Sequence, residues 1–128
     1  MFPKDLKYTK DHEWIRADGD VYIAGITAFA AGQLGDVTYV ELPAVGTEVE
    51  QGATVAAVES VKAASDVYAP AGGRVCEVNG KLESAPELVN QGPYEDGWFF
   101  KLEGVNASQL AGLMDAAAYE KFVGEQDH

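Results

Sequence analysis

The residue best suited to chemistry in this sequence is Lys62, in the run Glu59-Ser60-Val61-Lys62-Ala63. Short strand-like segments on both sides place Lys62 on the tight turn between two predicted strands. A lysine held there is exposed and geometrically defined, and an enzyme that acylates one particular lysine needs both properties. The ε-amine forms a stable amide, and its four-carbon stem extends the reach of an attached group. Turn lysines are common, however, and the spacing alone favours an ordinary solvated side chain.

Other chemistry-bearing patterns in the sequence are weak. His12-Glu13 is similar to the start of a zinc motif, but no second histidine follows at helical spacing, and His128 is the terminal residue. Ser60, His12 and Asp66 are the residue types of a catalytic triad, with nothing further to favour one. The single cysteine excludes an internal disulfide and a CxxC motif. We therefore expect no metal site and no catalytic residue.

The elements around Lys62 follow from frequent glycine and proline. The chain has 14 Gly and 5 Pro, separated by short runs rich in Val, Tyr and Ala, which is typical of many short strands joined by tight turns. Asp18-Gly19-Asp20 predicts a hairpin, because Asp-Gly supplies the positive φ of a tight turn. The predicted strands are Glu13–Arg16, Val21–Gly25, Val37–Glu41, Thr54–Ser60, Ala64–Tyr68, Arg74–Val78 and Trp98–Leu102.

Helices are expected in three places. Thr27–Leu34 predicts a short helix with Thr27 as its cap, and Glu83–Asn90 predicts another with Pro86 near its start. The clearest helical segment covers about residues 107–124, where apolar residues roughly follow helical spacing. Asp115 could cap a second helix within that segment.

Two segments on either side of Lys62 share the same pattern of strands and turns. Val37–Gly52 and Val67–Gly80 each read as a strand, a turn with proline and a second strand, and the segments meet near residues 59–66. This pattern predicts a mainly β fold, a flattened β-sandwich or barrel with short helices and a C-terminal helix. With 128 residues, 47% of them hydrophobic, we expect a single domain over residues 1–128.

The charge balance limits the class of partner. Nine Lys and Arg face 21 Asp and Glu, and the formal net charge of −12 argues against nucleic acid because phosphate is repelled. We expect a soluble monomer, whose charge either serves solubility alone or steers it toward basic partner surfaces. No apolar run is long enough for a signal peptide or a membrane span. The expected location is the bacterial cytoplasm, or the mitochondrial matrix for a mature eukaryotic protein.

The segment around Lys62 resembles the lipoylation segment of the glycine cleavage H proteins. The similar run is ESVKAASDVYAP, from Glu59 to Pro70. The resemblance covers nearly the whole chain in order. The further runs that resemble this family are KYTKDHEW (Lys7 to Trp14), GIT (Gly25 to Thr27), LGDVTYVELPAVG (Leu34 to Gly46), SAPELVNQGPYEDGWFFKL (Ser84 to Leu102) and LMDAAAYEKF (Leu113 to Phe122).

This resemblance implies a hybrid-motif β-sandwich with lipoate attached covalently to Lys62 as N6-lipoyllysine by a lipoylating enzyme. In the family, a pyridoxal-phosphate-dependent glycine decarboxylase (P protein) loads an aminomethyl group on the lipoyl sulfur. A folate-dependent aminomethyltransferase (T protein) removes it, releasing ammonia and methylenetetrahydrofolate. Dihydrolipoamide dehydrogenase (L protein) then reoxidises the dithiol with NAD. The implied role is a non-catalytic carrier that supplies proximity and shelter.

Residues near Lys62 are candidates for two supporting roles. Glu13 and Asp66 are candidate contacts for the loaded arm, since a cationic aminomethyl group suits a carboxylate. The alternative, that both are solvated surface carboxylates, stays open. The residues expected to shape what the lipoylating enzyme reads are Glu59, Ser60, Val61, Ala63 and Ala64.

Residues 28–33 depart from the family, because more polar and acidic residues are usual there than Ala-Phe-Ala-Ala-Gly-Gln. The departure leaves open an H-like lipoyl protein for lipoate relay or for lipoate-dependent sulfur oxidation. A biotinyl carrier is an alternative from another class, but its lysine normally lies between two methionines, whereas Val61 and Ala63 flank Lys62. An unmodified interaction domain is the remaining alternative.

Overall fold

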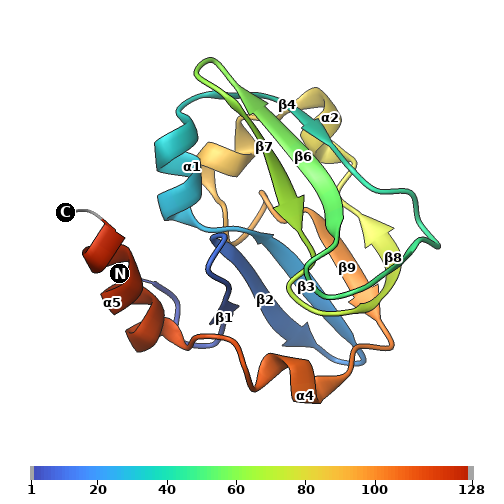
Figure 1. Cartoon of the computed structure of the whole chain (residues 1–128). Helices are drawn as coiled ribbons and strands as arrows, with labels where there is room; N and C mark the ends of the chain where they lie inside the picture. Colours follow the sequence, from blue (N-terminus) through green and yellow to red (C-terminus); the bar gives the residue numbers. More distant parts are fainter. Residues whose placement is uncertain (1, 127–128) are drawn as a thin grey trace.

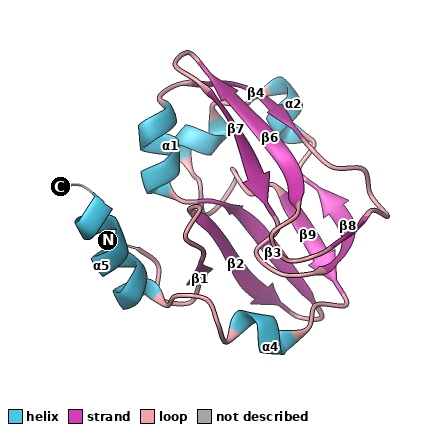
Figure 2. Ribbon diagram, viewed as in Figure 1, coloured by secondary structure: helices cyan, strands magenta, loops and turns pink. Residues whose placement is uncertain are grey.

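The computed structural model describes residues 2–126 and shows two antiparallel β-sheets with short helices around them (Figure 1; Figure 2). Within this range, one sheet has six strands in the order β1-β2-β3-β9-β8-β5 and the other has three in the order β4-β6-β7. The strands are β1 (Lys7–Tyr8), β2 (Glu13–Asp18), β3 (Val21–Ile26), β4 (Val37–Glu41), β5 (Glu48–Val49), β6 (Thr54–Ser60), β7 (Ala64–Tyr68), β8 (Gly73–Val78) and β9 (Phe100–Glu103). The helices are α1 (Ala28–Leu34), α2 (Lys81–Ser84), α3 (Leu88–Gln91), α4 (Ala107–Leu110) and α5 (Ala116–Gln126).

The main hydrophobic core lies between the two sheets. Ile15 and Ala24 of the six-stranded sheet belong to the same buried cluster as Val40, Val58 and Val67 of the three-stranded sheet. The alternation of side chains along each strand sends these residues to the facing sides of the sheets. The predicted β-sandwich with short helices and a C-terminal helix is therefore confirmed.

Helix α5 packs beside β1, and its residues form a second cluster with the neighbouring strands (Figure 1). Tyr8 and Trp14 are paired across β1 and β2, and both pack in this cluster with Tyr119 of α5. Ile15 enters the core between the sheets, whereas its neighbour Trp14 enters the cluster that includes α5. Strand β2 is thus buried on both faces, and it begins at Glu13.

The predicted strands are found as β2, β3, β4, β6, β7, β8 and β9, with ends that differ from the prediction by no more than two residues. The Asp-Gly hairpin is confirmed as well, because Asp18 pairs with Val21 and Gly19 has a φ of 64°. The two-residue strands β1 and β5 were not predicted, since so short a segment shows no hydrophobic period.

Of the two short helices that the sequence predicts, the structure confirms the first and contradicts the second. Thr27 caps α1 as predicted, with its Oγ1 accepting a hydrogen bond from the backbone N–H of Ala30 at 3.2 Å. The prediction of one helix over Glu83–Asn90 is wrong, because the chain forms α2 and α3 with a break at Ala85 and Pro86. Proline disfavours the helical conformation of the residue before it, and Ala85 has φ −137° and ψ 65°.

The C-terminal helical segment consists of two helices, α4 and α5. Between them Met114 forms an antiparallel bridge with Tyr8, in which each backbone N–H donates to the other residue's carbonyl. The chain leaves the helical conformation to make this bridge. Asp115 then caps α5, because its Oδ1 accepts a hydrogen bond from the backbone N–H of Ala118 at 2.8 Å.

Candidate functional site

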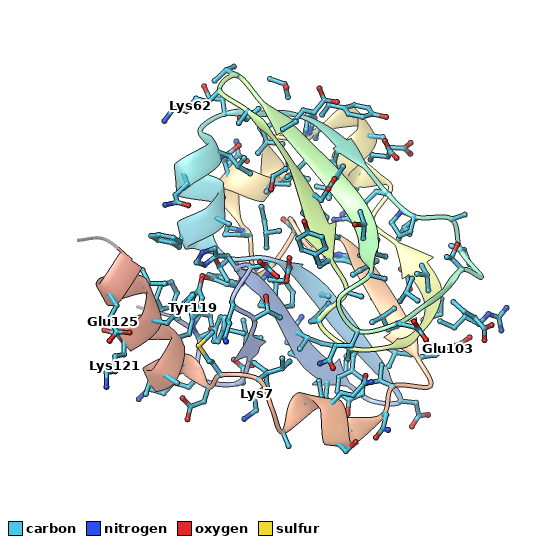
Figure 3. All side chains as sticks on the ribbon, viewed as in Figure 1. Lys7, Lys62, Glu103, Tyr119, Lys121 and Glu125 are labelled. Atoms are coloured by element: carbon cyan, nitrogen blue, oxygen red, sulfur yellow. The ribbon has the colours of Figure 1, made fainter. Side chains whose placement is uncertain are left out.

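Lys62 lies at the tip of the hairpin formed by β6 and β7 (Figure 3). Glu59 pairs with Ala64, and beyond this pair the Ser60 backbone N–H donates to the Ala63 carbonyl at 2.8 Å. The Ser60 hydroxyl closes the turn, because Oγ accepts hydrogen bonds from the backbone N–H groups of Lys62 and Ala63, both at 3.1 Å. Serine stabilises tight turns through such bonds. The backbone that carries Lys62 is therefore held by a neighbouring side chain.

The hairpin tip is attached to the segment that follows α1. The Val61 backbone N–H donates to the Asp36 carbonyl at 3.1 Å. The stem of Lys62 runs over Gly35, where an added Cβ would lie 3.4 Å from Lys62 Cε. Gly35 has a φ of 76°, a conformation that favours glycine. The end of α1 thus supports both the backbone and the stem of Lys62.

The side chain of Lys62 is open to solvent. Lys62 is exposed, and so are its neighbours Val61 and Ala63, with 69% of Val61 accessible. Within residues 2–126, both ion pairs join β8 to β9, so the ammonium group of Lys62 takes part in neither. An exposed amine on a held backbone is the arrangement that selective acylation requires.

A cleft of about 140 Å³ opens between α1, β7 and the start of β2. Glu13 and Asp66 are carboxylates in its lining, and its apolar lining includes Ala30, Leu34, Val58 and Val67. Two of its walls lead to the hairpin tip, because Gly35 follows α1 and Ala64 begins β7. A chain attached to Lys62 therefore starts close to a cleft that offers apolar surface and carboxylates.

Glu13 lines this cleft but is otherwise buried, with 2% of its surface exposed. Its carboxylate accepts hydrogen bonds from the Thr9 hydroxyl and, at 3.1 Å, from the Tyr68 backbone N–H. Burial raises the pKa of Glu13 to about 7, although both hydrogen bonds act to lower it. A cation beside this carboxyl group would favour its charged form. The solvated alternative is wrong for Glu13, whereas Asp66 is exposed.

The structure places the predicted site residues in two groups. The hairpin group is Glu59, Ser60, Val61, Ala63 and Ala64, and the cleft group is Glu13 and Asp66. Sequence reasoning did not single out Gly35 and Asp36, which support the hairpin tip. The signal for them is a glycine directly after the predicted helix, since glycine commonly ends helices.

The described part of the chain holds neither a group of metal ligands nor a membrane-spanning helix. Across residues 2–126, no three His, Cys, Asp or Glu side chains are grouped so as to hold a metal ion. In the same range, none of the helices has the length and apolar character of a membrane span.

The two-sheet antiparallel sandwich with an exposed lysine at a hairpin tip is the arrangement that the resemblance to lipoyl carriers implies. The family model described as glycine cleavage H-protein matches residues 6–126, and the chain therefore belongs to the glycine cleavage H-protein family. Members of this family carry a lipoyl group in the glycine cleavage system, and the chain shares that function.

Similar proteins match over nearly their full length. The glycine cleavage system H protein of Symbiobacterium thermophilum is 58% identical over 123 residues, which cover 96% of each chain. The H protein of Laribacter hongkongensis is 59% identical over 123 residues, which cover 95% of this chain and 97% of the relative. The crystal structure of a glycine cleavage system H protein from Mycobacterium marinum has a TM-score of 0.84 at 35% identity and covers 99% of this chain and 100% of that chain.

Proposed function

We propose that Lys62 carries the lipoyl group, through an amide between the lipoate carboxyl group and the lysine ε-amine. Formation of this amide releases water and removes the charge of the ammonium group. The observation that supports the assignment is the position of Lys62, exposed at a hairpin tip whose backbone is held by Ser60 and Asp36. The flexibility of such an arm resides in the side chain and the attached group, so one arm can reach several enzymes in turn.

We also propose a role for the hairpin group in modification. Val61 and Ala63 leave the amine accessible, and Glu59 stands exposed at the end of β6. Ser60 presents the backbone in one conformation. Together these features give the lipoylating enzyme a defined surface to read.

The residues that line the cleft suit, in their chemistry, a lipoyl arm that carries an aminomethyl group. When attached, the lipoyl group supplies a sulfur atom on which the aminomethyl group is carried. Ala30, Leu34 and Val67 offer apolar surface to the methylene chain. Glu13 and Asp66 offer carboxylates to the cationic amine, and the buried position of Glu13 reduces the screening of that attraction by water. These residues bind and shelter the cargo.

The proposed partners are the three enzymes of the family's pathway, glycine decarboxylase, aminomethyltransferase and dihydrolipoamide dehydrogenase. The chain supplies no catalytic group to their reactions and contributes proximity and the exclusion of water. We propose that residues 1–128 work as one domain and as a monomer. Because the similar proteins are bacterial, the proposed compartment is the cytoplasm.

A reconstituted glycine cleavage reaction tests the assignment of Lys62. Lys62→Arg keeps a long cationic side chain that is not acylated, so carrier activity should be lost while thermal unfolding stays unchanged. Lys81→Arg is the matched control, because Lys81 is also exposed but lies on α2, and it should keep full activity. Glycine cleavage supported by Lys62→Arg would overturn the assignment.

A further inference from the structure

Tyr119 of α5 is fully buried in the cluster that α5 forms with β1 and β2 (Figure 3). Its ring stacks on Tyr8, with centroids 4.5 Å apart and 6° between the planes. Its hydroxyl oxygen lies 2.7 Å from Nδ1 of His12 and 2.7 Å from Oγ1 of Thr27. Burial raises the pKa of Tyr119, so the hydroxyl keeps its proton and can donate to one partner while accepting from the other.

One partner of this hydroxyl, His12, lines the cleft, and the other, Thr27, caps the helix that forms another wall. Thr27 caps α1, whose Ala30 lines one wall, and the Thr27 backbone N–H donates to the His12 carbonyl at 2.9 Å. His12 lines another wall and directly precedes Glu13. Tyr119 itself is not part of the lining. One buried oxygen therefore joins two walls from outside the cleft.

His12 needs support from its surroundings. Its φ of 70° is the one positive φ of a non-glycine residue within residues 2–126. This conformation is unfavourable for a residue with a side chain and persists where neighbouring contacts fix it. The Tyr119 hydroxyl makes one such contact. Because Glu13 follows His12 directly, the placement of the Glu13 carboxyl group depends on how His12 is held.

We infer that Tyr119 is a positioning residue for the cargo, whose hydroxyl holds the two cleft walls at the separation that shelters a loaded lipoyl arm. This inference rests on the proposed function of the cleft. Through Tyr119, helix α5 would then affect how long the aminomethyl group stays attached, although α5 lies away from Lys62 (Figure 3). Loss of that group to water breaks its carbon–sulfur bond. Water supplies the oxygen of formaldehyde, the nitrogen leaves as ammonia, and the sulfur regains a proton as a thiol.

The test measures this loss on the full-length, lipoylated protein after loading, with no folate present. Formaldehyde released per loaded arm gives the rate. Tyr119→Phe removes one oxygen and keeps the stacked ring, so the release rate should rise roughly fivefold, the factor expected for about one net hydrogen bond. Tyr8→Phe is the matched control, because it removes a hydroxyl from the same ring pair whose bond goes to the Pro3 carbonyl at 2.6 Å. It should release cargo at the wild-type rate.

If Tyr119→Phe does not fold, two variants of Thr27 test the same contact, because Thr27 Oγ1 is the hydrogen-bond partner of the Tyr119 hydroxyl. Thr27→Val should release cargo faster, and Thr27→Ser, which keeps the oxygen, should restore the wild-type rate. The inference would be overturned if Tyr119→Phe and Thr27→Val both released formaldehyde at the wild-type rate. It would also be overturned if Tyr8→Phe and Tyr119→Phe accelerated the release equally. Neither result would argue against the proposed sheltering function of the cleft. Release from the native wild-type protein that is as fast as from the urea-unfolded protein would overturn the cleft's proposed function and this inference together.

Discussion

The Ser60 hydroxyl oxygen lies 3.1 Å from the backbone nitrogen of Lys62 and accepts its hydrogen bond. The same oxygen accepts a second bond from the Ala63 backbone N–H. The residue two positions before the anchor therefore orders the turn that presents it. An arm attached as proposed would move from the Lys62 side chain outward, because these bonds hold the backbone of the turn.

Removing this hydroxyl should slow modification of Lys62. Ser60→Ala deletes these two bonds and the hydroxyl's own bond to the Ala63 carbonyl, without adding bulk, so the lipoylating enzyme must order the turn itself. We expect the initial rate of lipoylation to fall about fivefold, which corresponds to about 1 kcal/mol for a net hydrogen bond. The rate is measured as mass gain with the enzyme limiting. Ser60→Thr keeps the oxygen and should react like the wild-type protein, whereas a wild-type rate for Ser60→Ala would show that the hydroxyl does not order the turn.

Alanine substitutions at Gly35 and Gly32 should change stability in opposite directions. Gly35 has φ 76° and ψ −154°, a region almost restricted to glycine, so Gly35→Ala should lower the free energy of unfolding by about 1–3 kcal/mol. Gly32 lies inside α1, and a Cβ there would meet nothing within 4 Å. Gly32→Ala should therefore raise the free energy of unfolding by about 0.5–1 kcal/mol. Urea denaturation measures both, and a Gly35→Ala variant as stable as Gly32→Ala would contradict the described support of the hairpin tip.

Stability should depend on pH through Glu13. Its folded pKa of about 7 lies above its ordinary value of 4.5, so the folded state binds the proton more tightly than the unfolded chain does. The stabilising contribution is therefore complete below about pH 4.5 and is lost as the pH rises through about 7. Glu13→Gln cannot ionise. Between about pH 5 and pH 8, the free energy of unfolding of this variant should therefore rise relative to that of the wild-type protein, by up to about 3 kcal/mol. Urea denaturation of both proteins across this range is the measurement, and a difference that stays constant would argue against a buried, titrating carboxyl group.

The parts of the fold that the sequence predicts are those set by local chemistry. Glycine and proline mark the turns between strands, and Asp18-Gly19 gives the hairpin its positive φ. Thr27 and Asp115 are short polar side chains placed where a helix needs a cap. The exposed turn that holds Lys62 contains neither glycine nor proline and follows from the strand-like segments on both sides of it, whereas its chemical role follows from the family resemblance.

The parts that sequence reasoning missed depend on contacts between distant segments. Glu13 is buried because β2 is covered on both faces, and one of its hydrogen bonds comes from Tyr68 on β7. The break before α5 is set by the pairing of Met114 with Tyr8. Tyr119 follows an ordinary helical spacing, and nothing in that spacing indicates that its hydroxyl reaches two walls of a cleft.

We propose that a single amine of this protein, that of Lys62, carries the lipoyl group. The most direct test is mass spectrometry of the intact protein and of its peptides, after production with lipoate and a lipoylating enzyme. We expect a gain of one lipoyl group per chain, located on the peptide that contains Lys62 and on no other lysine. No mass gain, a biotinyl group in its place, or a lipoyl group on a different lysine would contradict it.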